Sequence, residues 1–174
     1  VSEVCEVLKR SIKVLKVASE IEQHIAELGS EGRLVKMQLD EMIANVEDEA
    51  LLIIQDYSNA MEKTSHELLA AMMRSFEEDI SDSVFIARLL SLGTASSHLD
   101  QMVSPRGYRM LQKLPRIPTP IIDNLVERFG LLTHVLRATI EELDEVEGIG
   151  EVRARSIKNG LRRMQEQQML EYMV

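Results

Sequence analysis

Apolar residues recur every three or four positions through the first part of the chain, which is the spacing of one face of an α-helix. The pattern runs through Val4, Leu8, Ile12, Leu15, Ala18, Ile21, Ile25 and Leu28. Gly29 follows at the position where a glycine commonly ends a helix. We therefore expect a long first helix that ends next to Gly29.

A second apolar pattern follows the short break at residues 29–32, with alternating steps of four and three that are typical of a heptad seam. Its members are Leu39, Ile43, Val46, Ala50, Ile53, Tyr57 and Ala60. The positions between them include carboxylates that we expect to face solvent, namely Asp40, Glu41, Glu47, Asp48 and Asp56. Two long helices joined by a short turn predict an antiparallel helical hairpin.

Shorter helical patterns follow the hairpin. The periodicity weakens over residues 57–65, which indicates a helix end, and returns over residues 66–76. It returns again over residues 84–92, where either Ser81 or Asp82 has the side chain of an N-cap. We expect a short helix in each of these two stretches.

Residues 94–104 show the least apolar pattern and cluster Ser, Thr, Asp and Gln, so we interpret them as a linker. Ser104 and Pro105 then fit the N-cap and the first residue of a new helix. Helical patterns continue beyond them over residues 121–129 and 132–137. The sequence thus predicts an all-α protein with a helical spine over residues 1–103 and a second helical domain over residues 104–174.

A Gly-Ile-Gly turn at residues 148–150 separates two helical patterns in the second domain. Thr139 and Glu142 form a capping-box signature before the first pattern. The second pattern begins at Glu151, and its apolar positions are Val152, Ala154, Ile157 and Leu161. Two glycines allow a sharp turn with accessible N–H groups, and the helix that follows adds free donors and its positive dipole end. This turn is suited to holding a phosphate group.

A weak internal repeat relates this turn to an earlier segment. Residues 114–118 (Leu-Pro-Arg-Ile-Pro) align with residues 146–150 (Val-Glu-Gly-Ile-Gly), so Arg116 and Pro118 stand where the later copy has glycines. Pro118 has no N–H to donate, so the first hairpin cannot hold a phosphate in the same way. Either Arg116 contributes a direct charge, or the first hairpin is mainly structural.

Charge is distributed unevenly along the chain, which has a net charge of −9. Residues 1–104 contain 9 Lys/Arg and 19 Asp/Glu, giving −10, whereas residues 105–174 contain 11 and 10, giving +1. Residues 151–165 alone contain five bases and one acid. A polyanion would therefore be repelled by the first domain and attracted to the helix after the glycine turn.

The glycine turn with its flanking helices resembles the helix-hairpin-helix motif of sequence-tolerant DNA-binding proteins. Three segments in register make the resemblance more specific: residues 104–108 (Ser-Pro-Arg-Gly-Tyr), residues 114–118 and residues 143–155. Together they resemble the C-terminal two-thirds of DNA-integrity-scanning diadenylate cyclases. The resemblance extends into the first domain through residues 27–34, so it covers nearly the whole chain.

The resemblance implies a helical spine followed by a tandem helix-hairpin-helix domain that binds branched or recombination-intermediate DNA. The parent would be a homo-octamer whose N-terminal cyclase domain converts two ATP molecules to cyclic di-AMP with a divalent metal. The Asp-Gly-Ala and Arg-His-Arg motifs of that cyclase domain are absent here. We therefore expect this chain to be no enzyme, to bind no cofactor and no membrane, and to act in the cytoplasm at the nucleoid.

The predicted DNA-binding residues combine backbone donors with cationic side chains: Gly148, Ile149, Gly150, Val152, Arg153, Arg155, Lys158, Arg162 and Arg116. Backbone N–H groups at Gly150, Val152 and Arg153 would hold one phosphate, and the cations would add attraction that salt screens. No element is shaped to read base edges, so phosphate contacts should dominate and binding should not depend on sequence.

Two alternatives stay open. The spine could form an oligomer or a partner contact while the hairpin only packs, or the chain could be the DNA-binding tail of another repair protein. No catalytic or metal-binding set stands out, because the four histidines are far apart in sequence. The single cysteine, Cys5, excludes an intramolecular disulfide, and we expect it to be a small hydrophobic residue.

Overall fold

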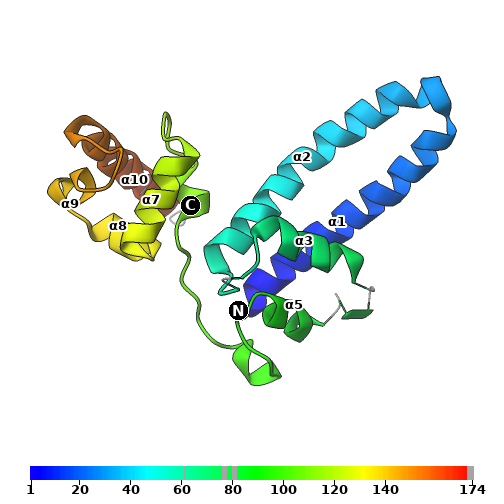
Figure 1. Cartoon of the computed structure of the whole chain (residues 1–174), viewed down its shortest axis with the longest axis horizontal. Coiled ribbons are helices and arrows are strands. Elements are labelled where there is room, and N and C mark those ends of the chain that lie inside the picture. Colours follow the sequence, from blue (N-terminus) through cyan, green and yellow to red (C-terminus); the bar gives the residue numbers. More distant parts are fainter. Residues whose placement is uncertain (61, 76–77, 80–81, 172–174) are drawn as a thin grey trace. The chain divides into compact units, whose positions relative to one another are not determined.

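The computed structural model describes residues 1–60, 62–75, 78–79 and 82–171 (Figure 1). The regular elements within these residues are helices, with no strand among them, which confirms the all-α fold class. The chain divides into two compact units, Val1–Val103 and Ser104–Val174. Each unit has a hydrophobic core of its own.

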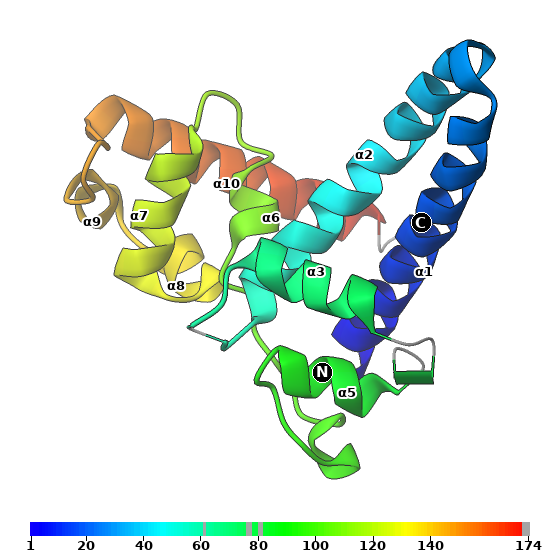
Figure 2. The same cartoon turned by 45° about the vertical axis from the view of Figure 1, so that its right-hand side comes forward.

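Two long antiparallel helices dominate the first unit, as Figures 1 and 2 show. Helix α1 (Ser2–Glu27) and helix α2 (Gly32–Tyr57) are joined by a single 3-10 turn, η1 (Gly29–Glu31). Gly29 has a φ of +60°, the left-handed conformation of a residue that ends a helix. The predicted hairpin and its glycine stop are therefore confirmed.

The core of the first unit lies at the root of this hairpin, where shorter helices pack against it. Helices α3 (Ser65–Arg74) and α5 (Ser83–Leu89) both contact α1, and α3 also contacts α2. The buried side chains there include Leu8 and Ile12 of α1 and Ile54 of α2. Near the tip the hairpin is only two helices thick, so the seam residues Leu39 and Ile43 are no more than half-buried.

The short helices of the first unit begin at side-chain caps. Thr64 and Glu67 form a capping box at the start of α3, with the Thr64 N–H donating to Glu67 Oε2 at 2.8 Å. Asp82 caps α5 by accepting from the Val84 N–H at 2.9 Å. Of the two predicted caps for this helix, Asp82 is confirmed, and Ser81 lies outside the described residues, as does residue 76 at the end of the preceding predicted helix.

The predicted acidic face of α2 is correct except at Asp56. Asp40 and Glu41 are exposed, but Asp56 retains only 3% of its surface. Asp56 lies in the penultimate position of α2, at the root of the hairpin, where shorter helices pack against the two long ones. The apolar periodicity of α2 does not show which later helices pack against it, so the burial of Asp56 could not be predicted.

The stretch interpreted as a linker is part of the first unit. It contains a 3-10 turn, η2 (Ser96–His98), and Leu99 and Val103 pack against the core. Its backbone also bonds the start of α1, since the Ser2 N–H donates to the Leu99 carbonyl at 3.0 Å. Interpretation of the whole of residues 94–104 as a connecting segment was therefore wrong, and the compact unit extends to Val103.

The second unit consists of five described helices around a core that includes Leu125, Leu143 and Ile157. They are α6 (Tyr108–Leu111), α7 (Thr119–Phe129), α8 (Leu132–Arg137), α9 (Ile140–Asp144) and α10 (Glu151–Glu171). The predictions for α7 and α8 are confirmed. No helix within the described part of the chain is both long and apolar enough to cross a membrane.

The prediction that Ser104 and Pro105 start a helix was wrong. Helix α6 begins only at Tyr108, after Gly107 with a φ of +120°. The carbonyl of Pro105 instead accepts a hydrogen bond from the Leu132 N–H at 3.0 Å, which ties this segment to the start of α8. This segment, which is outside any helix, is thus held by a contact with residues that follow much later in the sequence.

Candidate nucleic-acid interface

The second hairpin of this unit consists of α9, a turn over residues 145–150, and α10. The predicted capping box at the start of α9 is confirmed: the Thr139 N–H donates to Glu142 Oε2 at 2.7 Å, and Thr139 Oγ1 accepts from the Glu142 N–H at 3.2 Å. Val146 and Ile149 are buried at 5% and 6% exposure, so both apolar residues of the turn fasten it to the core. The turn is therefore a fixed structure.

The two glycines of the turn have different roles. Gly148 has a φ of +82°, and a Cβ atom there would lie 2.4 Å from Ile121 Cδ1. Its backbone conformation thus favours glycine, and the end of the Ile121 side chain would have to move to admit a Cβ atom. Gly150 has no left-handed φ, and a Cβ atom there would meet nothing within 4 Å. The space beside Gly150, at the start of α10, is therefore open.

This open space adjoins the free end of α10. The first bond of the helix runs from the Ala154 N–H to the Gly150 carbonyl at 2.9 Å. The N–H groups of Glu151, Val152 and Arg153 precede it, in the turn where a helix has no acceptor of its own for them. These donors and the positive end of the helix dipole converge next to Gly150.

Val152 was wrongly predicted to be an apolar anchor of α10. Its side chain is 85% exposed, whereas Ala154, Ile157 and Leu161 are buried as the spacing predicts. Val152 lies in the first turn of the helix, beyond the edge of the core. Any part it has in the site depends on its backbone N–H.

The arginines of α10 lie on its exposed surface and have weak partners within the chain. Arg153 donates from Nη1 to the carbonyl of Gly148, and Arg155 forms an ion pair with Glu151 at 2.5 Å. Arg162 lies 3.7 Å from Glu166. Exposed ion pairs of this kind contribute at most about 1 kcal/mol, so these guanidinium groups can exchange their partners for a phosphate.

Lys158 differs from these arginines because its ammonium group faces the core side of α10. Half-buried, it donates to the carbonyls of Leu136 at 2.8 Å and Ala138 at 2.5 Å. Both carbonyls lie at the C-terminal end of α8, where the helix dipole favours a cation. Lys158 therefore fastens α10 to α8, a function that the sequence pattern did not reveal.

The first hairpin consists of α6, a turn over residues 112–118, and α7. Arg116 is exposed and has a φ of +64°, the same left-handed conformation as Gly148 in the aligned position. Pro118 and Pro120 have no N–H, and the N–H groups of Ile121 and Ile122 donate to the Pro118 carbonyl. The backbone of this hairpin thus resembles that of the second hairpin but presents fewer donors.

Each hairpin packs against the other. Asn124 Nδ2 of α7 donates to the Glu147 carbonyl at 3.0 Å, and Arg128 pairs with Glu145 at 3.2 Å. In the opposite direction, Gly160 of α10 approaches the first hairpin so closely that a Cβ atom would lie 2.5 Å from Leu114 Cδ2. The two hairpins thus contact one another from both sides.

Acidic side chains border the site on its α9 side. Glu141 and Glu147 are exposed there, and the pKa of Glu141 is lowered, first by a hydrogen bond from its own backbone N–H and then by the Thr139 hydroxyl. Carboxylates on this side repel a polyanion, whereas α10 carries the exposed arginines and, in its first turn, one carboxylate, Glu151, that is paired with Arg155. A phosphate is therefore expected to approach from the α10 side of the turn.

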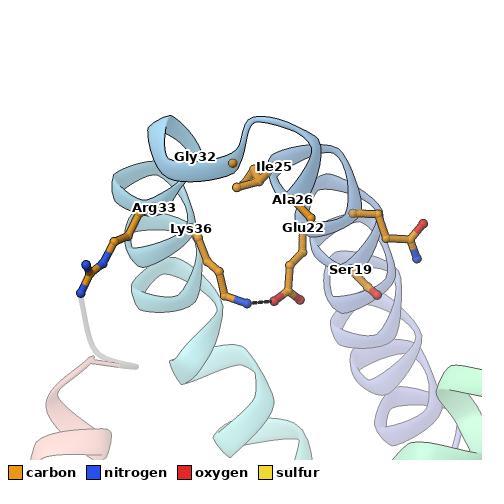
Figure 3. A pocket seen from close by; sticks show the side chains of 9 residues that line it. Ser19, Glu22, Ile25, Ala26, Gly32, Arg33 and Lys36 are labelled. Carbon is orange, nitrogen blue, oxygen red and sulfur yellow. Dashed lines mark hydrogen bonds and ion pairs between the residues drawn. The ribbon is translucent and has the colours of Figure 1, made fainter.

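A separate hollow lies at the tip of the α1/α2 hairpin in the first unit (Figure 3). It has a volume of about 490 Å³, and most of the residues that line it are exposed to solvent. Lys36 is hydrogen-bonded to Glu22 across it, which raises the pKa of Lys36. Within the described residues, no group of three or more His, Cys, Asp or Glu side chains could hold a metal ion.

Comparison with known proteins agrees with the resemblance found in the sequence. Residues 1–99 match the family model described as "DisA bacterial checkpoint controller linker region". The chain is 55% identical over 166 residues to the DNA integrity scanning protein DisA of Carboxydothermus hydrogenoformans. It is 46% identical over 170 residues to that of Bacillus subtilis and 49% over 170 residues to that of Symbiobacterium thermophilum.

These alignments cover 95% to 98% of the chain but 47% of each relative, so the chain spans about half the length of the curated relatives it matches. They extend through both compact units, whereas the family model covers the first. Since that model alone matches more than half of the residues, the chain belongs to the DisA bacterial checkpoint controller family.

Proposed function

We propose that this chain binds DNA without reading its sequence, as the sensor arm of a DNA-integrity-scanning diadenylate cyclase. The observation that supports this most directly is the difference between the two glycines of the second hairpin. The left-handed backbone of Gly148 and its contact with Ile121 favour glycine, but neither backbone conformation nor packing does so at position 150. A missing side chain there leaves the N-terminus of α10 accessible to a phosphate oxygen.

In this proposal the backbone donors hold one phosphate of the DNA backbone. They are the N–H groups of Gly150, Val152 and Arg153, with Gly148 and Ile149 shaping the turn. The side chains of Arg153, Arg155 and Arg162 supply charge along the exposed surface of α10. Lys158 supports DNA binding only by stabilising the fold, because its ammonium group already donates hydrogen bonds to two carbonyls.

Arg116 provides a second point of contact at the first hairpin. Its side chain is exposed, and it keeps a left-handed backbone that a glycine would adopt more easily. The first hairpin has too few backbone donors to repeat the phosphate cradle. A direct charge from Arg116 replaces that cradle and gives a tandem helix-hairpin-helix domain with two unequal contacts.

The proposal for the whole protein follows from the family. The relatives are named for DNA integrity scanning, which fits preferential binding of branched or recombination-intermediate DNA. Cyclic di-AMP synthesis from ATP with a divalent metal would take place in a domain outside this chain, in a homo-octamer in the cytoplasm at the nucleoid. A single module with two to four phosphate contacts binds weakly, so several copies would act together.

One observation favours a second function, an oligomerisation or partner-binding module in the spine. Val7, Val14, Ile21 and Leu28 follow one another at intervals of seven residues along α1 and its end, and all are 42–56% exposed. A row of exposed apolar residues with heptad spacing is typical of a helix that packs against a partner helix. The two functions lie in different units and do not exclude one another.

Fluorescence anisotropy with a labelled four-way junction and a linear duplex of matched composition tests DNA binding directly. We expect the chain to bind both, the junction more tightly, and unlabelled duplexes of different sequence to compete equally. Gly150→Pro should abolish binding, because proline removes a donor from the turn. Val14→Lys on α1 is the control, and it should disturb self-association or partner binding only. Loss of DNA binding in Val14→Lys alone would favour the spine as the functional part.

A further inference from the structure

Helix α7 contacts the phosphate-binding turn of the second hairpin through three residues on one face. Ile121, Asn124 and Arg128 are separated by three and four positions, so they lie above one another on the helix. Ile121 packs against Gly148, Asn124 donates to the Glu147 carbonyl at 3.0 Å, and Arg128 pairs with Glu145 at 3.2 Å. The turn is therefore held partly from outside its own hairpin.

The hydrogen bond from Asn124 has a consequence for the next residue. The Glu147 carbonyl and the Gly148 N–H belong to one planar trans peptide and point in opposite directions. Since Asn124 holds that carbonyl toward α7, it turns the Gly148 N–H away from α7. Gly148 has a φ of +82° and no side chain, so it has little intrinsic preference that would keep this peptide in one orientation.

The following peptide of the turn is held from within the hairpin. The Gly148 carbonyl accepts from Arg153, and the Ile149 N–H donates to the Val146 carbonyl at 2.9 Å. Among the described residues, the peptide before Gly148 is the one that a side chain of the other hairpin bonds. The contact of Ile121 is apolar, and the Arg128–Glu145 pair joins two side chains, so neither bonds the peptide group itself.

We propose that Asn124 is a positioning residue for the DNA site: it fixes the Glu147–Gly148 peptide so that the Gly148 N–H joins the donors of α10 that face a phosphate. This inference rests on the proposed function of the second hairpin. Asn124 does not touch DNA itself but acts through Gly148. The first hairpin thereby assists phosphate binding by its neighbour, in addition to any contact of its own through Arg116.

Two substitutions separate positioning from other roles. Asn124→Leu keeps a similar volume without a donor, and Asn124→Gln keeps the amide on a longer side chain. Asn124→Leu should weaken binding of the four-way junction roughly fivefold, the effect of one hydrogen bond, and Asn124→Gln should restore most of it. Because no cation is lost, the dependence of log affinity on log salt should keep its slope in both variants. Arg155→Gln is a cation control on α10. It should make that negative slope shallower by about 1.

The amide signal of Gly148 in a ¹⁵N–¹H NMR spectrum gives a readout that loss of stability would not produce. In the unaltered chain it should shift when junction DNA is added, and in Asn124→Leu it should shift less, with the midpoint of thermal unfolding nearly unchanged. Wild-type affinity and an undiminished Gly148 shift in Asn124→Leu would overturn the inference, as would equal losses in the Leu and Gln variants. Absence of DNA binding by the unaltered chain would instead refute the proposed function.

Discussion

Arg116 and Gly148 occupy equivalent positions in the two hairpins, and both adopt a left-handed backbone, with φ of +64° and +82°. The residues two places before them, Leu114 and Val146, are both buried at 5% exposure. The internal repeat is thus a repeat of backbone conformation, although one copy has replaced its glycines. An arginine in this conformation is strained, and the strain provides a way to test what its side chain does.

Replacing Arg116 by glycine and by alanine separates its backbone strain from its charge. Arg116→Gly relieves the left-handed strain, so we expect unchanged or higher stability, by up to about 1 kcal/mol. Arg116→Ala keeps the strain and should be the less stable of the two in urea unfolding. Both remove the charge, so the negative slope of log DNA affinity against log salt should become shallower by about 1. If neither changes DNA binding, Arg116 does not contact DNA directly.

The two glycines of the second hairpin should respond differently to alanine. In Gly148→Ala the new Cβ atom meets Ile121 Cδ1 at 2.4 Å and the φ of +82° is unfavourable. We expect a loss of about 1–3 kcal/mol in urea unfolding. Gly150→Ala meets nothing within 4 Å, so its stability should stay within about 0.5 kcal/mol of the unaltered chain.

The DNA affinity of Gly150→Ala distinguishes a phosphate site from an ordinary turn. Its methyl group would occupy the open space at the start of α10, so anisotropy should show clearly weaker binding by a protein of normal stability. Normal affinity in this variant would mean that no phosphate approaches Gly150. Gly130→Ala also meets nothing within 4 Å, but its φ of +73° is unfavourable for alanine and it lies at the end of α7, so this variant should lose stability and keep its DNA affinity.

Lys158 and Arg155 should show opposite effects although both are basic residues of α10. Lys158→Met removes two hydrogen bonds from a half-buried ammonium group, so we expect a stability loss of about 1–3 kcal/mol. Its salt slope for DNA binding should be unchanged. Arg155→Gln removes an exposed charge and should leave stability within about 0.5 kcal/mol. The reverse outcome would be a Lys158→Met variant of normal stability whose log DNA affinity depends less steeply on log salt. It would show that Lys158 contacts DNA.

The thiol of Cys5 should be unreactive in the folded protein. Cys5 is fully buried at the root of α1, and burial raises the pKa of its thiol above the ordinary value. The thiolate fraction at pH 8 is therefore lower than in a free cysteine, and access is blocked as well. An aromatic disulfide reagent should react slowly with the native chain and rapidly in urea. Equal rates in the two conditions would show that this end of the hairpin opens readily.

How much the sequence could predict depended on how local each cause was. Gly29 ended its helix as expected, because the stop is a property of adjacent residues. Asp56 and residues 94–103 were misjudged because helical periodicity does not show contacts with distant segments: Asp56 is buried, and Leu99 and Val103 pack against the core of the first unit. At the site, the spacing indicated the glycine turn, but it grouped Lys158 with the arginines and gave Val152 a place in the core. Only tertiary contacts separate those roles.

The central claim is that the second unit holds DNA through its phosphates, and the salt dependence of affinity tests this most directly. Anisotropy of the unaltered chain with a labelled four-way junction would be measured from about 50 to 200 mM salt. With two to four phosphate contacts, log affinity should fall against log salt with a slope of about −2 to −4, which weakens binding by roughly 15- to 250-fold over that range. A flat dependence, or no binding at the lowest salt, would contradict the account.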